Sequence, residues 1–415
     1  MVSDPALPHV NKAVNGEWTV DPVALTAALV ACPSVTPDAG EALDLAEAFC
    51  RTHGLVTERL VFGSGADRVD NLFAQVDFGD ADSISTRPHV AFAGHLDVVP
   101  TGDPNAWAHG PFSGAMDGGY LHGRGATDMK SGVAAFMAAV ANFLQASAKG
   151  SPGRISFIIT GDEEGPAING TVRMLDWMCK NGHTPDHCIV AEPSSLDICG
   201  DQIKVGRRGS VSGTLTAHGL QGHVAYPEKA LNPIPRLAAM IAAITDAPLD
   251  GGVSRGNNRF QPSHLEFTTI ATGNSANNVI PGAATARFNI RYNVSQTPDA
   301  LKAELERRAA SVAGADAFSI SLDPNPSEPF LTEDAYLLDL AKAAIFHVTG
   351  ATPDTSTGGG TSDARFIKTL CPVLELGLPG KTMHAVDERV AIDDIRTLTR
   401  IFEAFLARYF PNPSG

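Results

Sequence analysis

Apolar segments with the character of buried strands alternate with helical segments in the first half of the chain. The strands are predicted at residues 89–94, 154–160 and 187–192, and the helices between them at residues 131–148 and 172–182. Such alternation is typical of a mainly parallel sheet covered by helices, because each parallel connection needs a crossover. We therefore predict an α/β domain, in which ligands bind at the carboxyl ends of the strands.

A stretch of different character interrupts this pattern. Between residues 209 and 327 the strand-like segments alternate apolar and polar positions, which is typical of a sheet with one exposed face, and two helical segments accompany them. The first pattern then returns, with a helix, a strand and a second helix at residues 335–350, 372–377 and 393–410. We therefore predict a discontinuous catalytic domain, residues 1–208 and 328–415, with an inserted α+β domain at residues 209–327.

Charge and composition restrict the partners of this chain. The net charge of −15 over 415 residues disfavours binding to nucleic acid or to an anionic membrane. No apolar run reaches the about 18 residues that a membrane span needs, and residues 1–20 lack the pattern of a secretory signal, so we expect them to form a flexible extension. The six cysteines have no CxxC spacing and are expected to be reduced thiols of a cytoplasmic protein.

Side chains that can bind metals follow the predicted strands of the catalytic domain. Together with the glycine-rich loop 122–132, these strand ends supply two histidines and six carboxylates: His95, Asp97, Asp128, Asp162, Glu163, Glu164, Glu192 and His384. Each of them alone is more often a loop, cap or surface residue, so the prediction rests on their common position. Clustered carboxylates repel one another unless a cation neutralises them. Aspartate, glutamate and histidine without cysteine favour zinc, cobalt or manganese.

The number of candidates fits two metal ions, each bound by one histidine and one glutamate, with one carboxylate bridging them. Such sites activate a water molecule between the ions, so one further carboxylate should remain free to accept its proton. We expect Glu163 and Glu164 to supply one ligand and one base, because neighbours on an extended segment point to opposite sides. Asp97 is expected to accept a hydrogen bond from the second ring nitrogen of His95 and so to orient that ligand.

The chain resembles peptidase family M20, a family of dinuclear metallohydrolases, in the segments GHLDVVP, GRGATDMKSG, GDEEGPAINGT and AEPSS and at a late histidine. Within the family, agreement is closest with the bacterial enzymes that act on N-succinyl-diaminopimelate, in GRRGSVSG, GLQGHVAYPEKALNPI, SANNVIPG, NIRYN and GGGTSDARFI. The resemblance covers residues 21–410 approximately. It implies metal-dependent hydrolysis of N-succinyl-LL-2,6-diaminopimelate to succinate and LL-2,6-diaminopimelate, in lysine and cell-wall precursor biosynthesis.

The resemblance also implies how the metals are held. His95 and Glu192 would bind one ion, and Glu164 and His384 the other. Asp128 would bridge the two ions, and the peptide bond that follows it would be cis. Zinc is the metal expected first, with cobalt and manganese as alternatives.

Two further roles follow from the resemblance. Glu163 would act as general base and then as general acid. His223, in the inserted domain, would reach the active site of a partner subunit and polarise the amide oxygen of the substrate. The insert would then be the dimerisation domain of a homodimer.

A succinylated diamino dicarboxylate carries three carboxylates, so its binding site should contain fixed cations and other donors. Arginine is suited to this task, because its planar fork binds a carboxylate through two hydrogen bonds. Surface ion pairs or turns are the alternative roles of the candidate residues. The candidates are Arg207, Arg208, Ser210, Tyr226, Asn277, Asn278, Arg291, Gly360, Thr361 and Arg365.

The chain departs from the family pattern at Ala364, Gly380, Lys381 and Ala385. These departures leave the candidate metal ligands in place but loosen the assignment of the substrate. One alternative is therefore another amidohydrolase of the family, such as an acetylornithine deacetylase or an aminoacylase. The other is a non-catalytic metal-binding protein, which the intact Glu163 argues against, because a binding protein needs no free base.

Overall fold

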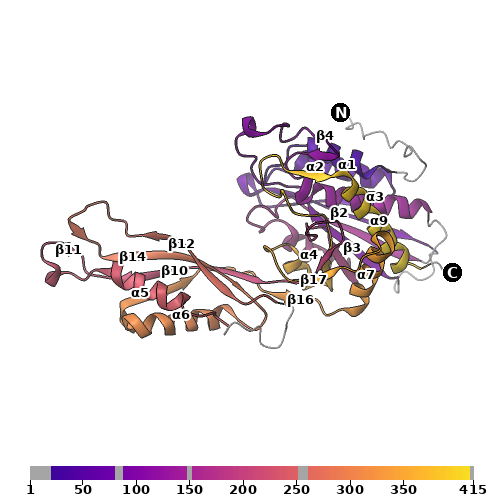
Figure 1. Cartoon of the computed structure of the whole chain (residues 1–415). Helices are drawn as coiled ribbons and strands as arrows, with labels where there is room; N and C mark the ends of the chain where they lie inside the picture. The colour runs from indigo at the N-terminus through magenta and orange to yellow at the C-terminus, as the bar shows by residue number, and fades with distance from the viewer. Residues whose placement is uncertain (1–19, 80–86, 147–151, 251–259, 412–415) are drawn as a thin grey trace. The chain divides into compact units, whose positions relative to one another are not determined.

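The computed structural model describes residues 20–79, 87–146, 152–250 and 260–411, and the predicted extension at residues 1–20 lies outside them except for Val20. The chain forms two compact units (Figure 1). Unit 1 comprises Met1–Val205, Thr332–Thr355 and Ser362–Gly415, and unit 2 comprises Gly206–Leu331 and Ser356–Thr361.

Unit 2 is slightly larger than the predicted insert at residues 209–327. Both connecting chains belong to it, because β9 (Gly206–Arg207) pairs with β16 (Phe330–Leu331) in a short antiparallel ladder. It also includes Ser356–Thr361, which the sequence placed in the catalytic domain. Arg207 Nη1 donates a hydrogen bond of 2.8 Å to the carbonyl of Gly360, which ties that segment to β9.

An eight-stranded sheet forms the middle of unit 1, in the order β1-β2-β6-β3-β7-β18-β8-β17. The strands are β1 (Val56–Phe62), β2 (Val69–Phe78), β3 (His89–His95), β6 (Gly153–Thr160), β7 (His187–Val190), β8 (Gln202–Lys204), β17 (Asp354–Ser356) and β18 (Val373–Glu375). The four central strands, β6, β3, β7 and β18, run parallel, and this confirms the predicted fold class. The pairs β1–β2, β2–β6 and β18–β8 are antiparallel. The connection at residues 63–68 is too short for the crossover that would make β1 and β2 parallel.

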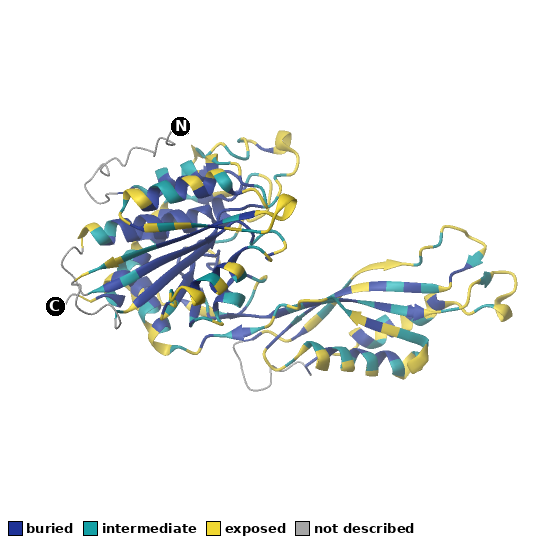
Figure 2. Cartoon of the chain, turned by 180° about the vertical axis from the view of Figure 1, so that it is seen from behind, coloured by how far each residue is buried: buried dark blue, intermediate teal, exposed yellow. Residues whose placement is uncertain are grey.

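Helices enclose this sheet. They are α1 (Pro22–Ala31), α2 (Gly40–Thr52), α3 (Ser131–Ala146), α4 (Thr171–Lys180), α7 (Ala335–Thr349), α8 (Ala364–Ile367) and α9 (Ile392–Tyr409). Helices α3 and α9 pack against each other, with α1 and α7 beside them. Phe92 of β3 contacts the rings of Phe136 in α3 and Phe402 in α9, with centroids 5.6 and 5.3 Å away. This buried aromatic cluster fixes β3, which ends at His95, within the core (Figure 2).

A small sheet of three antiparallel strands also belongs to unit 1, and the sequence analysis did not predict it. Its order is β19-β5-β4, with β4 (Ala115–Asp117), β5 (Tyr120–His122) and β19 (Arg389–Ala391). None of the helices in the described part of the chain has the length and apolar character needed to cross a membrane.

Unit 2 contains an antiparallel sheet in the order β12-β14-β10-β15, with α5 and α6 packed on it. Its elements are β10 (Gly209–His218), β11 (Gly222–His223), α5 (Pro233–Thr245), β12 (His264–Ala271), β13 (Val279–Ile280), β14 (Ala283–Tyr292), α6 (Pro298–Ala313) and β15 (Phe318–Leu322). Alternate residues of β10 are buried, and Leu215 joins Met240 of α5 and Leu305 of α6 in one apolar core. One face of the sheet is therefore covered, as the alternating sequence pattern predicted.

Candidate active site

The candidate metal ligands of the central strands emerge at the carboxyl edge of the parallel sheet. His95 is the last residue of β3 and pairs in register with Thr160, the last residue of β6. Glu163 and Glu164 follow the end of β6 by three and four residues, and Glu192 follows the end of β7 by two residues. Parallel pairing thus brings chemically related side chains from distant parts of the sequence to one edge.

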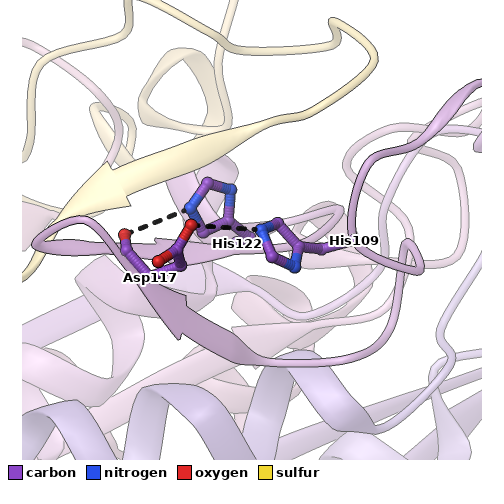
Figure 3. A group of neighbouring side chains, drawn as sticks. All are labelled: His109, Asp117 and His122. Atoms are coloured by element: carbon purple, nitrogen blue, oxygen red, sulfur yellow. Dashed lines mark hydrogen bonds and ion pairs between the residues drawn. The ribbon is translucent and has the colours of Figure 1, made fainter.

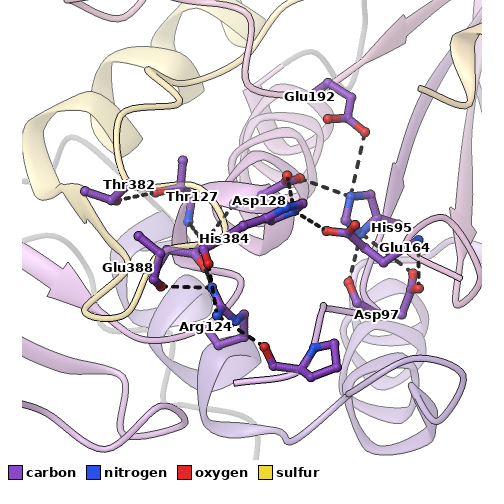
Figure 4. A network of polar contacts seen from close by, with 12 residues as sticks. His95, Asp97, Arg124, Thr127, Asp128, Glu164, Glu192, Thr382, His384 and Glu388 are labelled. Carbon is purple, nitrogen blue, oxygen red and sulfur yellow. Dashed lines mark hydrogen bonds and ion pairs between the residues drawn. The ribbon is translucent and has the colours of Figure 1, made fainter. Parts of the chain in front are cut away.

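Asp128 lies between two histidines (Figure 4). Its Oδ1 is 3.2 Å from His95 Nε2, and its Oδ2 is 3.3 Å from His384 Nε2. His95 Nε2 is also 3.7 Å from Glu192 Oε1, and His384 Nε2 is 2.9 Å from Glu164 Oε1. Two groups of three potential ligands therefore share the Asp128 carboxylate, and within each group the ligand atoms lie within 4.8 Å of one another. The peptide bond between Asp128 and Met129 is cis.

The electrostatics of this cluster favour positive charge at the two histidines. The pKa of His384 is raised to about 10 by its hydrogen bonds to Asp128 and Glu164. Burial opposes protonation of His95, but the hydrogen bond to Asp128 and the surrounding carboxylates outweigh it and raise the pKa well above its usual value. Burial would raise the pKa of Asp128, yet the two histidines hold it far below the ordinary range. The cluster combines carboxylate oxygens and imidazole nitrogens, and its excess negative charge favours a bound cation. Such a set of donors fits divalent metal ions.

Glu163 and Glu164 do not lie on an extended segment. The chain bends at both residues and at Gly165, and the ligand atoms of His95, Glu163 and Glu164 lie within 4.8 Å of one another. The expectation that the two side chains point to opposite sides is therefore wrong, because period-two alternation needs extended backbone. Burial, followed by the charge of Glu192, raises the pKa of Glu163 well above its usual value. A carboxylate in these surroundings takes up a proton readily, as a general base requires.

Asp97 holds the backbone of this bend. Its carboxylate oxygens accept hydrogen bonds from the backbone N–H groups of Glu163 and Glu164, at 3.2 and 3.1 Å. The hydrogen bond from His95 Nδ1 goes instead to the backbone carbonyl of Asp97, at 2.9 Å, while the carboxylate is 3.7 Å away. The main-chain carbonyl of Asp97 thus orients His95. The hydrogen bond expected between His95 and the Asp97 carboxylate is not formed, and that carboxylate binds the backbone N–H groups of the two glutamates instead.

Asp162, the remaining carboxylate in this segment, has a different environment. Its side chain accepts hydrogen bonds from the backbone N–H groups of Ala167, Ile168 and Asn169, at 2.9–3.2 Å. It therefore stabilises the loop that leads into α4, and the structure gives it no place among the ligand groups of the described residues.

Two residues that the sequence analysis missed connect the ligand-bearing loops. Glu388 accepts hydrogen bonds from the backbone N–H groups of Thr127 and Asp128, at 2.8 and 3.1 Å, and from Arg124 Nη1 at 2.7 Å. Arg124 also donates to the carbonyls of Ala385 and His384. The pair thus fixes the Asp128 loop to the His384 loop. Their positions in GRGATD and shortly after His384 were visible, but nothing in the sequence showed that they meet.

The candidate substrate residues lie in unit 2, apart from Arg365, which belongs to unit 1. Arg291 of β14 is paired in register with Ser210 of β10 and with His264 of β12. Arg208 Nη1 is 3.1 Å from His264 Nδ1, and burial, with the charge of Arg291, lowers the pKa of Arg208. Among the described residues, the buried Nε of Arg208 has no hydrogen-bond partner. Two neighbouring guanidinium groups in this setting favour an anion.

The other polar candidates of unit 2 are more exposed. His223 is exposed on β11, and its Nδ1 accepts a hydrogen bond of 3.0 Å from the backbone N–H of Ala225. In the neutral ring the proton then resides on Nε2, which can donate to a ligand. Tyr226 is exposed with its ring centroid 5.9 Å from that of His223. The remaining exposed or half-buried candidates are Asn277, Asn278, Gly360 and Thr361.

Comparison with known proteins gives matches along most of the chain. The sequence profile of peptidase family M20/M25/M40 matches residues 91–408. A protein of Rhodopseudomonas palustris (strain BisB5) named succinyl-diaminopimelate desuccinylase is 50% identical over 392 residues, which cover 94% of this chain and 98% of that protein. A protein of the same name from Afipia carboxidovorans is 50% identical over 384 residues, covering 92% and 97% of the two chains.

Solved structures share the fold at low sequence identity. Aminopeptidase PepT from Bacillus cereus has a TM-score of 0.73 at 18% identity, covering 94% of this chain and 98% of that one. A dinuclear metal binding peptidase of the M20 family from Bacillus subtilis has a TM-score of 0.68 at 15% identity, with the same coverage. Human carnosine dipeptidase 1 has a TM-score of 0.69 at 20% identity, covering 94% and 95% of the two chains.

Proposed function

The chain belongs to peptidase family M20/M25/M40, and on this basis we propose that it hydrolyses N-succinyl-LL-2,6-diaminopimelate to succinate and LL-2,6-diaminopimelate. The observation that carries the proposal is 50% identity, over 94% of the chain, to a protein named succinyl-diaminopimelate desuccinylase. The reaction is a step of lysine and cell-wall precursor biosynthesis. A cytoplasmic location accords with the six cysteines, all of which are free thiols.

The ligand groups fit two divalent metal ions. We assign His95 and Glu192 to one ion, Glu164 and His384 to the other, and Asp128 to both, since the two groups of ligand atoms share its carboxylate. Zinc suits these nitrogen and oxygen donors best, with cobalt or manganese as alternatives. When bound, the metals supply Lewis-acid polarisation of the amide and lower the pKa of a water molecule.

Side chains of the protein carry out the proton transfer. Glu163, with its pKa raised by burial and by the charge of Glu192, accepts the proton of the attacking water and passes it to the leaving amine. Asp97 positions Glu163 through the backbone hydrogen bond of 3.2 Å. Glu388 and Arg124 hold the loops that bear Asp128 and His384.

Substrate recognition is assigned to donors that match three carboxylates. Arg208 and Arg291 supply adjacent positive charge on the sheet of unit 2, and Arg365 supplies it in unit 1. The further candidates offer guanidinium, hydroxyl, amide or backbone donors: Arg207, Ser210, Tyr226, Asn277, Asn278, Gly360 and Thr361. Replacing Arg291 with glutamine is expected to raise KM more than it lowers kcat, since the contact of Arg291 with a substrate carboxylate already exists in the ground state.

The oxyanion that develops at the amide carbonyl oxygen calls for a further donor, and we assign this role to Nε2 of His223 from the partner subunit of a homodimer. Removal of such a donor typically costs ~10²–10³-fold in turnover. Complementation tests the assignment: inactive Glu163→Ala is mixed with inactive His223→Ala. Subunit exchange is verified by co-purification of differently tagged chains, and light scattering gives the oligomeric state. Returning activity supports action across the interface. Verified exchange without activity contradicts it, as does a stable monomer at micromolar concentration.

Turnover on defined substrates tests the proposed reaction. Metal-stripped protein is reloaded with zinc and assayed on N-succinyl-LL-2,6-diaminopimelate and on N-acetylornithine, with Glu163→Ala as the control. The proposal predicts a kcat/KM for the succinylated substrate that is at least 10³-fold higher, because a site with buried polar donors rejects a ligand that leaves them unpaired. Equal or higher kcat/KM on N-acetylornithine would assign the chain to another activity of the family. Metal binding without turnover on either would favour the non-catalytic alternative.

A further inference from the structure

A second group of potential metal ligands lies outside the candidate active site, in unit 1. His109 follows a turn of the loop between β3 and β4, Asp117 ends β4, and His122 ends β5 (Figure 3). Their ligand atoms lie within 4.8 Å of one another. The proposed hydrolysis gives none of the three a role. We propose that they form a third metal site, which binds a borderline divalent cation such as zinc.

The three side chains face one another. His109 Nε2 is 3.7 Å from Asp117 Oδ2, and the rings of His109 and His122 have centroids 4.4 Å apart at an interplanar angle of 46°. The distance of 3.7 Å is too long for a hydrogen bond, and the contact of His122 Nε2 with the carbonyl of Asp117, at 3.4 Å, is a weak one. The three side chains therefore converge, but the contacts between them are too long to be strong hydrogen bonds.

Closure around a cation needs only small movements. In a tetrahedral zinc site with bonds of about 2.0–2.1 Å, neighbouring ligand atoms are about 3.3 Å apart. The His109–Asp117 pair is already near this spacing, and the widest pair must approach by no more than about 1.5 Å. The side chains of Asp117 and His109 are 73% and 33% exposed, so rotation about their side-chain bonds can supply the movement.

The backbone that carries the ligands is held on both sides. Ala108, which precedes His109, donates its N–H to Asp387 Oδ1 at 2.7 Å, and the carbonyl of Pro111 accepts from the N–H of Arg124 at 2.7 Å. His122 lies in the middle of its sheet, paired with Ala115 of β4 and with Arg389 of β19. The backbone that carries the ligands is therefore fixed, which lowers the entropy lost when a cation binds.

The donor set selects the class of cation. Two imidazoles and one carboxylate suit zinc, nickel or copper, whereas calcium and magnesium take oxygen ligands. Three protein ligands leave a fourth position for water. The guanidinium of Arg389, opposite His122 in the ladder and 5.1 Å from the centroid of the Tyr120 ring, adds positive charge nearby. We therefore expect zinc to bind here more weakly than at the dinuclear cluster, which offers more carboxylates.

Metal stoichiometry tests the proposal. Tag-free, metal-stripped protein is dialysed against increasing free zinc, and bound zinc per chain is measured by atomic emission. The wild type should take up three ions, the third at a higher zinc concentration than the first two. His109→Gln and Asp117→Asn should take up two. His347→Gln removes an exposed histidine of α7 that lies outside all ligand groups of the described residues, and this matched control should still bind three.

Two results would overturn the proposal. One is saturation of the wild type at two ions, and the other is equal uptake by the wild type and both variants. Asp117 is exposed, so the Asp117→Asn variant is expected to fold. Circular dichroism and the binding of two zinc ions at the dinuclear cluster verify the fold of this variant, whatever the outcome for His109→Gln. Because bound metal is counted rather than turnover, a failure of the proposed hydrolysis leaves this test intact.

Discussion

Replacing Asp97 with asparagine is expected to slow turnover while both active-site metals stay bound. The buried carboxylate of Asp97 accepts the backbone N–H groups of Glu163 and Glu164, at 3.2 and 3.1 Å. His95 Nδ1 donates instead to the backbone carbonyl of Asp97, and this contact of 2.9 Å survives replacement of the side chain. The perturbation therefore acts on the base and its neighbour rather than on the histidine ligand.

The size of the effect follows from the two hydrogen bonds. A hydrogen bond to a charged group contributes about 1.5–3 kcal/mol, and one between neutral groups about 0.5–1.5 kcal/mol. Asparagine keeps one oxygen acceptor but presents its NH₂ group to the second backbone N–H, so one bond weakens and the other is lost. The cost is about 2–4 kcal/mol in total, part of which reduces stability. Because ~1.4 kcal/mol corresponds to a factor of ten, we expect kcat to fall roughly 100-fold.

The assay is kcat and KM on N-succinyl-LL-2,6-diaminopimelate, together with zinc per chain. Asp162→Asn is the matched control, because Asp162 is also buried and accepts backbone N–H groups, but from Ala167, Ile168 and Asn169. It should lower stability with a smaller loss of kcat. If Asp97→Asn loses one zinc ion together with its activity, the side chain supports the metal directly and this reasoning is refuted.

Four further substitutions test other parts of the site and the fold. Glu163→Gln should keep both metals and lose ~10²–10⁴-fold in kcat; retained turnover, or loss of metal with activity, would remove Glu163 from the role of base. His95→Ala and His384→Ala should each lose one active-site metal, measured at a zinc concentration too low to fill the third site, and unchanged zinc content would contradict the ligand assignment. Burial lowers the pKa of His89 from 6.5 to about 4, so between these values the unfolded chain binds a proton that the folded chain does not. The free energy of unfolding should therefore fall by up to about 3 kcal/mol as the pH drops through this window. Urea titrations of His89→Gln should have a shallower decline, and an equal slope would refute the assignment.

Much of the fold was readable from local pattern. The strand at residues 89–94, the helix at residues 131–148 and the alternation within residues 209–327 each have their counterparts in β3, α3 and β10. Whether a position is buried depends on the face of the strand or helix on which it lies. The spacing of apolar residues along the sequence therefore indicates the element type directly. The antiparallel edges of the large sheet were not predicted, because the partner of an edge strand depends on the length of its connection and on its neighbours in space.

The sequence by itself determined which residue types stand at the ends of the parallel strands, and this was enough to indicate a metal site at the carboxyl edge of the sheet. Only the tertiary structure decided which of those residues form hydrogen bonds with one another. Asp97 binds the backbone of the glutamates rather than the ring of His95, and Arg124 meets Glu388 across 264 positions of the chain. The type and spacing of residues are local properties, whereas a hydrogen bond depends on angstrom-scale placement that only the packing of distant segments supplies.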